Sequence, residues 1–524
     1  MPEWFSILPP FFAILLSLIT RQVVLSLFAG IWLGSFFVYH YNPIVSFLMT
    51  LDHYVKPALA DPDHAAILIF TMMLGGMAGL ITKNGGTAGL VKVVTRFATT
   101  AQRGQLVTYL LGILIFFDDY ANTLIVGNTM RPITDRLKIS REKLSFLVDA
   151  TSAPVACLFI STWVGFEIGV IRDSLQGTGF AQDPFSIFLW SIPYRFYPIF
   201  TIILMGIMIA LNRDIGGMAK AEIRARTTGK LLRDGAEPAS DLTESKEIAV
   251  APHIPKRWYN ACIPVGAVIV ITLIGLYITG LNTLTQQGGE RTLRNILANS
   301  SSSDALFWSS LSGCAIAILL SIGQRILTLK EAMEAWFGGI RSMLLACLIL
   351  LLAWSLAGVT QELKTADFVV GALTGKISYG WLPFLIFLLS CLISFATGTS
   401  WGTMAVVMPL TTPLAWAMAQ SAGLNPVDAQ NFLYSAVSSV LAGAVFGDHC
   451  SPISDTTVMS SMTSGCDHID HVRTQMPYAV LAGVISMIAL ISAGHGASPY
   501  LLVGIGSMAL FMILRFFGKK VNHS

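Results

Sequence analysis

The stretch that decides the fold is Phe116-Phe117-Asp118-Asp119-Tyr120-Ala121-Asn122-Thr123. Its two adjacent carboxylates lie inside an apolar run, Leu106–Met130, that holds no other charged residue. A charge at the centre of a membrane helix costs roughly 2.5–3.5 kcal/mol on insertion scales, so such residues are functional candidates by default.

A second polar stretch also lies within apolar surroundings. It reads Gly447-Asp448-His449-Cys450-Ser451-Pro452-Ile453-Ser454-Asp455-Thr456-Thr457. We expect the two stretches to meet near the membrane midplane and to form one cation site.

The composition places the chain in a membrane. Of 524 residues, 54% are hydrophobic and 12% charged, and the mean hydropathy is +0.67. Soluble domains carry about 25% charged residues. Apolar segments of on the order of 20 residues, long enough to span, recur throughout, which predicts an all-α polytopic membrane protein. The seven cysteines show no CxxC spacing, which argues against a metal cluster or a disulfide framework.

About 11 segments are predicted to span the membrane, apart from two apolar stretches, Leu106–Met130 and Trp381–Leu414, whose centres are polar or rich in glycine. The predicted spans are Trp4–Leu18, Val23–Tyr41, Ala65–Ile81, Leu147–Ile171, Phe185–Leu211, Ala261–Thr279, Leu306–Ile322, Met343–Val359, Leu433–Val445, Ala479–Ile491 and Leu501–Phe516.

Loop charges predict a re-entrant hairpin. The loops at 83–103 and 131–143 are both rich in Lys and Arg, so both should be cytoplasmic. The stretch between them therefore cannot be a single span, and we expect a helical hairpin that turns near Asp118–Asn122. Irregular backbone at that depth must be buried in protein or face a watery cavity.

The two halves of the chain match weakly and in the same order. A polar segment, 213–258, separates a first repeat (1–212) from a second (259–494), and an extra C-terminal helix and tail (495–524) follow. Basic loops of the first half correspond to acidic or balanced loops of the second, which predicts two inverted-topology repeats, each with a hairpin and a broken helix. Inverted repeats with broken helices are typical of secondary transporters.

The first hairpin supplies the central candidates. Two carboxylates as close as Asp118 and Asp119 resist joint ionisation, and a cation can replace the proton that one of them retains. The alternative is that one caps a half-helix and the other pairs with a distant base. Asn122 and Thr123 offer neutral oxygens suited to Na⁺, or satisfy backbone groups freed by the turn.

Polar residues around Pro154 mark a break in the next segment. Proline removes a backbone donor, so Thr151 and Ser152 can line the interruption. Asp149 is either an ion or proton ligand or the cap of a half-helix that begins near Ala153. Glu167 is a further carboxylate within the same apolar segment.

The second hairpin replaces acids with hydroxyls and glycines at Thr397, Gly398, Thr399, Ser400 and Trp401. Such a turn exposes carbonyl and N–H groups to an ion or to a substrate carboxylate. The alternative is close packing of small residues between helices.

Asp448, His449, Ser451, Ser454 and Asp455 form the densest polar group. The histidine is either a proton carrier or a hydrogen-bonding residue of the broken helix. His468 and His471 follow with Asp467 and Asp470, a run that suggests a metal site, but because it falls at a loop we expect these histidines to lie in a solvated turn.

Residues 116–122, 151–154, 397–401 and 447–457 resemble those of the NhaC-type sodium/proton antiporter family, and the resemblance covers nearly the whole chain. It implies inverted repeats with hairpins, secondary transport of Na⁺ and H⁺, an elevator-like movement and a homodimer in the cell inner membrane. Some members exchange small organic acids or amino acids with cations.

We therefore expect an antiporter that exchanges Na⁺ for H⁺ by alternating access, with Na⁺ at Asp118, Asn122 and Asp448 and with a cytoplasmic C-terminus. Membrane lipid, Na⁺ and H⁺ are the expected partners, with no nucleic acid and no cofactor. No Walker-type glycine loop is present, which argues against ATP hydrolysis.

The main alternative is a Na⁺- or H⁺-coupled transporter of a small organic acid or amino acid, as in malate/lactate exchange. It is favoured if Thr397–Ser400 and Arg172 face a roomy pocket. A channel or a hydrolase using Ser451 fits the pattern less well.

Overall fold

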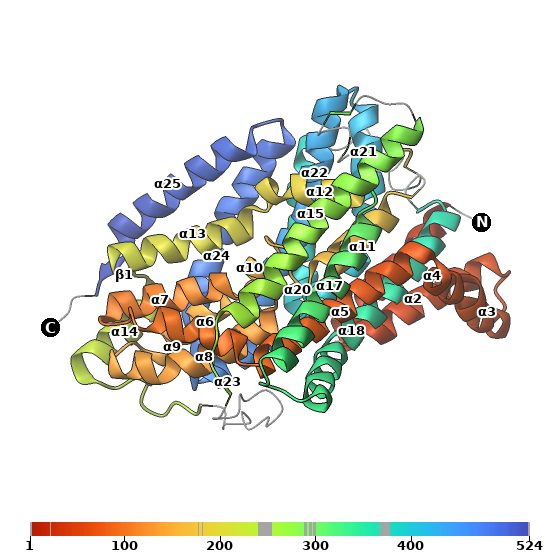
Figure 1. Cartoon of the computed structure of the whole chain (residues 1–524). Coiled ribbons are helices and arrows are strands. Elements are labelled where there is room, and N and C mark those ends of the chain that lie inside the picture. Colours follow the sequence, from red (N-terminus) through yellow and green to blue (C-terminus); the bar gives the residue numbers. More distant parts are fainter. Residues whose placement is uncertain are drawn as a thin grey trace.

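The computed structural model describes residues 3–20, 22–176, 178–180, 182–238, 254–287, 291–292, 296, 300–365, 368 and 378–521. These residues form helices joined by short connections, and their only sheet is a two-stranded antiparallel ribbon of β1 (Arg213–Asp214) and β2 (Lys519–Lys520). The two ends of the chain lie at opposite ends of the molecule (Figure 1).

Nine helices of the described residues are long and apolar enough to cross a membrane, and two bent helix pairs raise the number to at most 11. This confirms the predicted polytopic all-helical class. The inverted relation between the two halves and the domain boundaries at 212, 258 and 494 stay predictions.

The first half begins with two antiparallel helices, α1 and α2. The chain then bends by 120° between α2 and the following segment α3–α4. Asn42 accepts hydrogen bonds from the N–H groups of Ile44 and Val45, which starts α3 after this bend. The elements of this half are a 3₁₀ turn Glu3–Ile7, α1 (Leu8–Thr20), α2 (Val23–Val38), α3 (Pro43–Met49), a π-helical turn Thr50–Val55, α4 (Lys56–Ala60), α5 (Pro62–Lys83), α6 (Gly86–Thr95), α7 (Ala101–Leu114), α8 (Asp119–Arg136), α9 (Arg141–Asp149), α10 (Ala153–Ala156), α11 (Val164–Ser174), α12 (Pro184–Ser191), a 3₁₀ turn Ile192–Tyr194 and α13 (Phe196–Leu211).

Longer helices dominate the second half. The longest, α18, has 34 residues and starts with a capping box in which Thr328 and Glu331 satisfy each other's backbone N–H groups. The elements are α14 (Gly216–Thr228) in the connecting segment, then α15 (Tyr259–Gln287), α17 (Ser302–Gly323), α18 (Leu329–Glu362), a 3₁₀ turn Tyr379–Trp381, α20 (Leu382–Thr397), α21 (Ser400–Ser421), α22 (Pro426–Cys450), α23 (Asp455–Ser464), α24 (His468–Gly494) and α25 (Pro499–Phe517).

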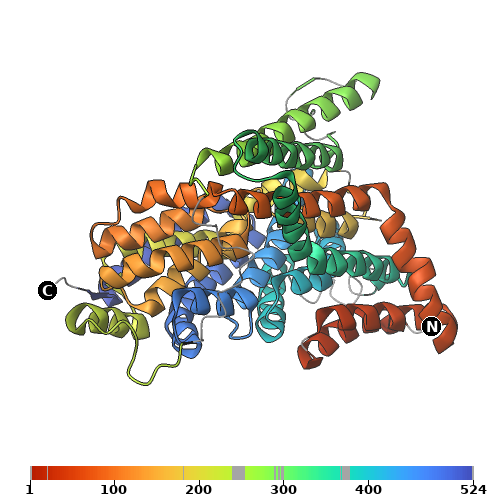
Figure 2. The same cartoon turned by 60° about the horizontal axis from the view of Figure 1, so that its bottom comes forward.

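Helices α5 and α18 cross at glycines. A Cβ on Gly339 would lie 2.1 Å from the carbonyl oxygen of Gly75, so only glycine permits this approach of the two backbones. Small residues at such crossings are typical of membrane helices. Figure 2 shows α15 and α17 as an outer layer over α5.

Both predicted hairpins are present as helix pairs. In the first, α7 and α8 are joined by 115–118, and Asn122 Nδ2 of α8 donates to the carbonyl oxygen of Gly112 in α7 over 2.7 Å. In the second, α20 and α21 are joined at Gly398 and Thr399. Each helix of this second pair is itself long and apolar enough to span.

The break predicted around Pro154 in the segment Leu147–Ile171 is present. The segment consists of the end of α9, the single turn α10, an irregular segment at 157–163 and the start of α11. A similar interruption at 451–454 separates α22 from α23. Pro154 and Pro452 lie in or beside these two breaks, as expected from their missing N–H groups.

The start of the segment between the halves is tightly packed. Asp214 is buried and accepts hydrogen bonds from Lys143 Nζ of α9 and, over 2.7 Å, from Tyr478 Oη of α24. The adjacent β1 pairs with β2 near the end of the chain. We call this the Asp214 clasp, because it connects the first half, the second half and the C-terminal segment.

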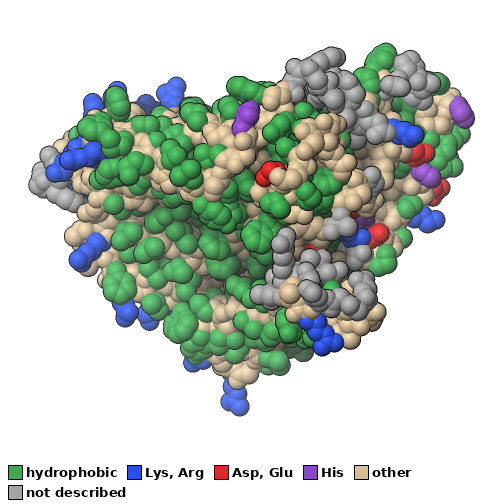
Figure 3. Space-filling model, turned by 90° about the horizontal axis from the view of Figure 1, so that it is seen from above, with side chains coloured by type: hydrophobic (Ala, Val, Ile, Leu, Met, Phe, Trp, Pro, Cys, Tyr) green, Lys and Arg blue, Asp and Glu red, His purple; other side chains and the backbone are tan. Residues whose placement is uncertain are grey.

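Charged side chains differ between the two ends of the molecule. In Figure 3, Lys and Arg prevail at the left end, where α14 and the C-terminal residues lie in Figure 1, whereas Asp, Glu and His appear toward the right. A wide apolar surface separates the two ends in this view. This pattern suits a protein that spans a bilayer.

Candidate cation site

A small cavity of about 80 Å³ lies where the two hairpins and the second helix break approach α18. Three carboxylates contribute to its wall: Asp119 from the first hairpin and Asp448 and Asp455 from either side of the second break. The remaining lining residues are Tyr120, Trp163, Ser342, Met343, Leu345, Ile349, Thr399, Ser400 and Trp401. Two stretches separated by more than 300 positions in the chain therefore share one cavity.

Asp119 and Asp448 are buried, with 2% and 3% of their surface exposed. Ser400 Oγ donates to Asp448 Oδ2 over 3.2 Å. Asp448 Oδ1 and Asp119 Oδ1 are buried and accept no hydrogen bond within the described residues. A buried carboxylate oxygen without a donor needs a proton or a cation for its stabilisation.

Tyr120 connects the two sides of this cavity. Its hydroxyl group, at the start of α8, donates to Asp455 Oδ2 at the start of α23. The same two helices pack along their lengths, as α8 lies against both α9 and α23. The first hairpin is thus held directly to the second half of the chain.

The other residues of the first hairpin turn take different positions. Asp118 is buried, and its carbonyl oxygen accepts the Asn122 N–H over 3.0 Å. Asn122 Nδ2 is engaged by two carbonyl oxygens, whereas its Oδ1 is buried without a donor among the described residues. Thr123 Oγ1 donates to the Asp119 carbonyl oxygen over 2.9 Å, so its hydroxyl satisfies the backbone.

The first hairpin is attached to the first helix break. Asn122 Nδ2 donates to the carbonyl oxygen of Thr151 over 2.7 Å. Thr151 Oγ1 donates a hydrogen bond to the carbonyl oxygen of Leu147 over 2.8 Å. Ser152 Oγ is buried and has no hydrogen-bond partner in the described part of the chain. The hairpin turn and the break therefore form one unit.

Asp149 does not cap a half-helix, so that alternative is wrong. The residue before α10 is Ser152, and no side chain caps this helix. The Asp149 carboxylate instead accepts hydrogen bonds from α23 and α24, as a buried group with four partners. These are Thr457 Oγ1 (3.1 Å), Ser460 Oγ (3.3 Å), His471 Nε2 (3.2 Å) and Gln475 Nε2 (2.7 Å).

His449 points away from the cavity that Asp448 lines. Its Nδ1 lies 2.5 Å from Tyr197 Oη of α13, and its carbonyl oxygen accepts the Gln475 side chain. His449 and Asp149 thus share Gln475 as a partner. His471 is fully buried in the first turn of α24, so the expected solvated turn is wrong for this residue.

The second hairpin turn is attached to the second break in the same way. Gly398 has a φ of 67°, and a Cβ there would lie 2.8 Å from the carbonyl oxygen of Ile453. Ser451 Oγ donates to the carbonyl oxygen of Phe395 over 2.8 Å. Thr397 Oγ1 donates to the carbonyl oxygen of Ile393 in its own helix. Ser454 Oγ lies 3.1 Å from Thr456 Oγ1.

A buried ion pair supports the segment after the first break. Arg195 Nη1 contacts Glu167 Oε2 over 2.8 Å, and both side chains are fully buried. The same guanidinium donates to the carbonyl oxygen of Cys157, which lies in the irregular segment. Glu167 therefore has an internal partner in Arg195 that the sequence pattern did not indicate.

The described residues contain no group of three or more His, Cys, Asp or Glu side chains arranged to hold a metal ion. A Na⁺ ion in the small cavity would therefore need serine, threonine, backbone or water oxygens beside one or two carboxylates. Thr399 and Ser400 supply hydroxyl groups on this wall.

Two helix hairpins and two helix breaks around a carboxylate-lined cavity, within a bundle of membrane-length helices, define a multi-pass membrane transporter. The chain belongs to the Na⁺/H⁺ antiporter family, whose model matches residues 155–495. This confirms the resemblance noted in the sequence.

Known proteins resemble the chain over different lengths. A Haemophilus influenzae protein described as uncharacterized is 31% identical over 520 residues, which cover 98% of this chain and 95% of that protein. The malate-2H(+)/Na(+)-lactate antiporter of Bacillus subtilis is 34% identical over 188 residues, 34% of this chain and 36% of that protein. The solved structure of Neisseria gonorrhoeae MtrF, described with a class of antimetabolite efflux pumps, covers 85% of this chain and 84% of that chain, with a TM-score of 0.53 and 13% identity. This last likeness concerns the fold alone.

Proposed function

We propose that the protein exchanges Na⁺ for H⁺ by alternating access, with the cavity of Asp119, Asp448 and Asp455 as the shared binding site. One observation carries the proposal: Asp119 and Asp448 each present a buried oxygen without a hydrogen-bond donor to or beside this cavity. Membership of the Na⁺/H⁺ antiporter family supports the same exchange.

Competition between the two ions follows from the electrostatics. Carboxylates that share a cavity of low dielectric constant repel one another when all are ionised. Protonation relieves this repulsion, and a bound Na⁺ relieves it equally well. Binding of one ion therefore expels the other, which is the requirement for exchange.

The size of the cavity favours an ion. Its volume of about 80 Å³ corresponds to two or three water molecules at about 30 Å³ each. Asp118, in the connection before α8, and Asn122, in the first turn of α8, do not line this cavity, but Asn122 Oδ1 is a buried oxygen without a donor beside Asp119 in the chain. We retain Asp118, Asn122 and Asp448 as Na⁺ ligands together with Asp119.

We further propose that both hairpins and both broken helices move as one body relative to α5 and α18. The contacts that tie each hairpin to a break support this division, as does the close glycine crossing of α5 and α18. The protein would lie in the inner membrane as a homodimer, with its basic end and its C-terminus in the cytoplasm.

The test is Na⁺-dependent dissipation of an imposed pH gradient in proteoliposomes. We expect Na⁺ to collapse the gradient with the wild-type protein and to fail with Asp119→Asn and with Asp448→Asn. Asp428→Asn is the matched control, because Asp428 is exposed in the first turn of the same helix as Asp448. Full exchange by both cavity variants would contradict the proposal.

A second candidate is Na⁺- or H⁺-coupled transport of a small organic acid or amino acid. The similarity to the malate-2H(+)/Na(+)-lactate antiporter supports it. Against it, Thr399, Ser400 and Trp401 line the small cavity, and Arg172 does not line that cavity. Gradient collapse that requires added malate or lactate, beyond Na⁺, would favour this second candidate.

A further inference from the structure

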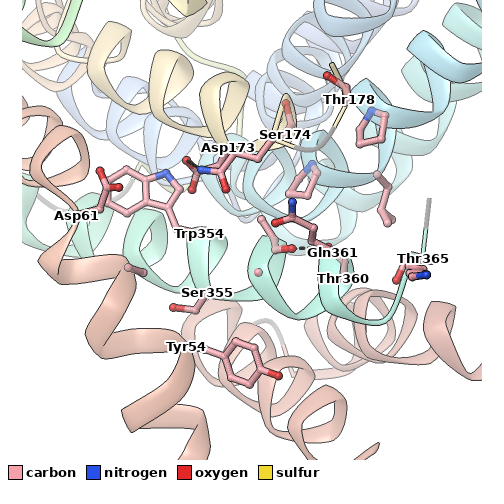
Figure 4. A pocket seen from close by; sticks show the side chains of 18 of the residues that line it. Tyr54, Asp61, Asp173, Ser174, Thr178, Trp354, Ser355, Thr360, Gln361 and Thr365 are labelled. Carbon is pink, nitrogen blue, oxygen red and sulfur yellow. Dashed lines mark hydrogen bonds between the residues drawn. The ribbon is translucent and has the colours of Figure 1, made fainter. Parts of the chain in front are cut away.

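A second and much larger cavity, of about 670 Å³, lies elsewhere in the fold (Figure 4). It is bounded by α4, α5 and the C-terminal parts of α11, α18 and α21. None of its lining residues lines the small carboxylate cavity. Its volume is within the range of about 300–1,000 Å³ that is typical of small-molecule sites.

One wall of this cavity is acidic and rigid. Asp173 Oδ1 is held by His64 Nε2 over 2.7 Å and by Gln176 Nε2 over 3.3 Å. The His64 ring is fixed in turn, because Nδ1 contacts the Ala58 carbonyl oxygen over 2.7 Å and the ring stacks on Trp354 at 3.8 Å and 7°. Both of these hydrogen bonds are made to Oδ1, so Oδ2 of the same carboxylate, which is also paired with His64, is the oxygen that can accept from a cationic group.

The far end of the cavity carries one basic side chain. Lys364 follows the end of α18 and lines the cavity, and it forms no ion pair with any residue that the structure describes. Figure 4 shows Asp173 and Trp354 toward one end and Thr365, the neighbour of Lys364, toward the other. Gln361 lies between them in Figure 4, and Gln420 also lines the cavity. No side-chain hydrogen bond of either glutamine is found in the described part of the chain.

The separation of the two walls limits the length of a ligand. Eight residues separate Trp354 from the last residue of α18, Glu362, a rise of about 12 Å, and Lys364 follows two positions later. An extended chain of three residues spans at most about 10 Å, and the Lys364 side chain covers part of the rest. Free amides such as those of Gln361 and Gln420 match the polar backbone of such a chain.

We propose that this cavity binds an elongated zwitterion, of which a peptide of two or three residues is the chemical type. Its terminal ammonium group is held by Asp173 beside Trp354, and its terminal carboxylate by Lys364. The site is distinct from the cation site and does not rest on the exchange of Na⁺ for H⁺.

The test is isothermal titration of the full-length protein in detergent and K⁺ buffer without Na⁺, with trialanine as the probe. We expect saturable binding that weakens at least tenfold when the peptide is N-acetylated or C-amidated. Lys364→Gln should weaken trialanine binding at least tenfold, whereas Lys330→Gln, on the exposed first turn of α18, should not. Because Lys364 is exposed, this variant retains the fold.

A cross-comparison identifies which wall holds which end. The amidated peptide should bind wild type and Lys364→Gln equally, and the acetylated peptide should bind wild type and Asp173→Asn equally. Absence of saturable trialanine binding, equal affinity for all three peptides, or an unchanged affinity of Lys364→Gln would each overturn the proposal. Because Na⁺ is absent, loss of ion exchange has no bearing on these outcomes.

Discussion

Gln475 of α24 donates its side-chain amide to Asp149 of α9 over 2.7 Å and also to the carbonyl oxygen of His449. A single amide group thereby joins the first helix break to the second. Neither Asp149 nor His449 lines the small carboxylate cavity. The hydrogen bonds of Gln475 therefore connect the two breaks outside that cavity.

Replacing Gln475 by Leu should therefore destabilise the protein. The substitution leaves a buried carboxylate and a carbonyl oxygen without this donor, at a cost of about 1–3 kcal/mol. The apparent Tm in detergent should fall. Gln286→Leu, at an exposed position near the end of α15, should stay close to wild type, and an unchanged Tm for Gln475→Leu would show that the network carries no stability.

Tyr120→Phe should slow ion exchange while the protein still folds. The variant keeps the ring and loses the hydroxyl group that contacts Asp455, so the first hairpin and α23 lose their polar connection in the cavity. A loss of about 1.4 kcal/mol corresponds to roughly a tenfold slower exchange, measured by gradient dissipation. Tyr500→Phe is the control, because Tyr500 is 69% exposed. Equal rates for both variants would refute a role for this contact.

Gly398→Ala should disturb the second hairpin turn. A φ of 67° is strained for alanine, and the new Cβ would lie 2.8 Å from the Ile453 carbonyl oxygen. We expect a cost of about 1–3 kcal/mol and a lower Tm. Gly504→Ala provides the contrast, because nothing lies within 4 Å of a Cβ at that position of α25, and alanine should be tolerated or slightly stabilising there. The prediction is wrong if the two variants melt alike.

Glu167 and Arg195 should show strong coupling. Removing one member of a buried ion pair costs about 3–5 kcal/mol, because the other charge remains unpaired. Glu167→Gln and Arg195→Gln should each lower the Tm sharply, and the double variant should lose less than the sum of both. Arg195→Gln should be the more damaging single change, since Arg195 also donates to the Cys157 carbonyl oxygen. Additive losses would exclude coupling.

The proposed orientation can be tested with introduced cysteines. In a Cys262→Ser background, which removes an exposed native thiol, Lys230→Cys should react with a membrane-impermeant maleimide only in inside-out vesicles. Asp304→Cys, at the start of α17, should react in intact cells. The reverse labelling pattern would place the C-terminus outside.

The sequence predicted the features that depend on local chemistry. Basic loops on both sides of Leu106–Met130 indicated the first hairpin, and Pro154 indicated the first break. Polar residues inside apolar runs marked Asp119, Asp448 and Asp455, because such residues stand out against a membrane context.

The sequence did not predict contacts made by single polar residues within apolar helices. Tyr197 and Gln475 lie in apolar helices where a single polar group is common, and only the fold brings them to His449. The solvated turn predicted for His471 is wrong because its neighbours Asp467 and Asp470 suggested a loop, whereas Asp467 caps α24 and Asp470 lies in its first turn. The pairing of His64 with Asp173 joins positions 109 residues apart and has no sequence signature.

The Asp214 clasp also bears on how such a chain can evolve. Lys143 of the first half and Tyr478 of the second both bond Asp214, and the β1–β2 ribbon adds the C-terminal segment. These contacts connect the first half, the second half and the C-terminal segment at one place. We expect two polypeptides divided between Pro238 and Ile254 to associate through these contacts when they are expressed together, so that a gene fission is one route open to such a chain.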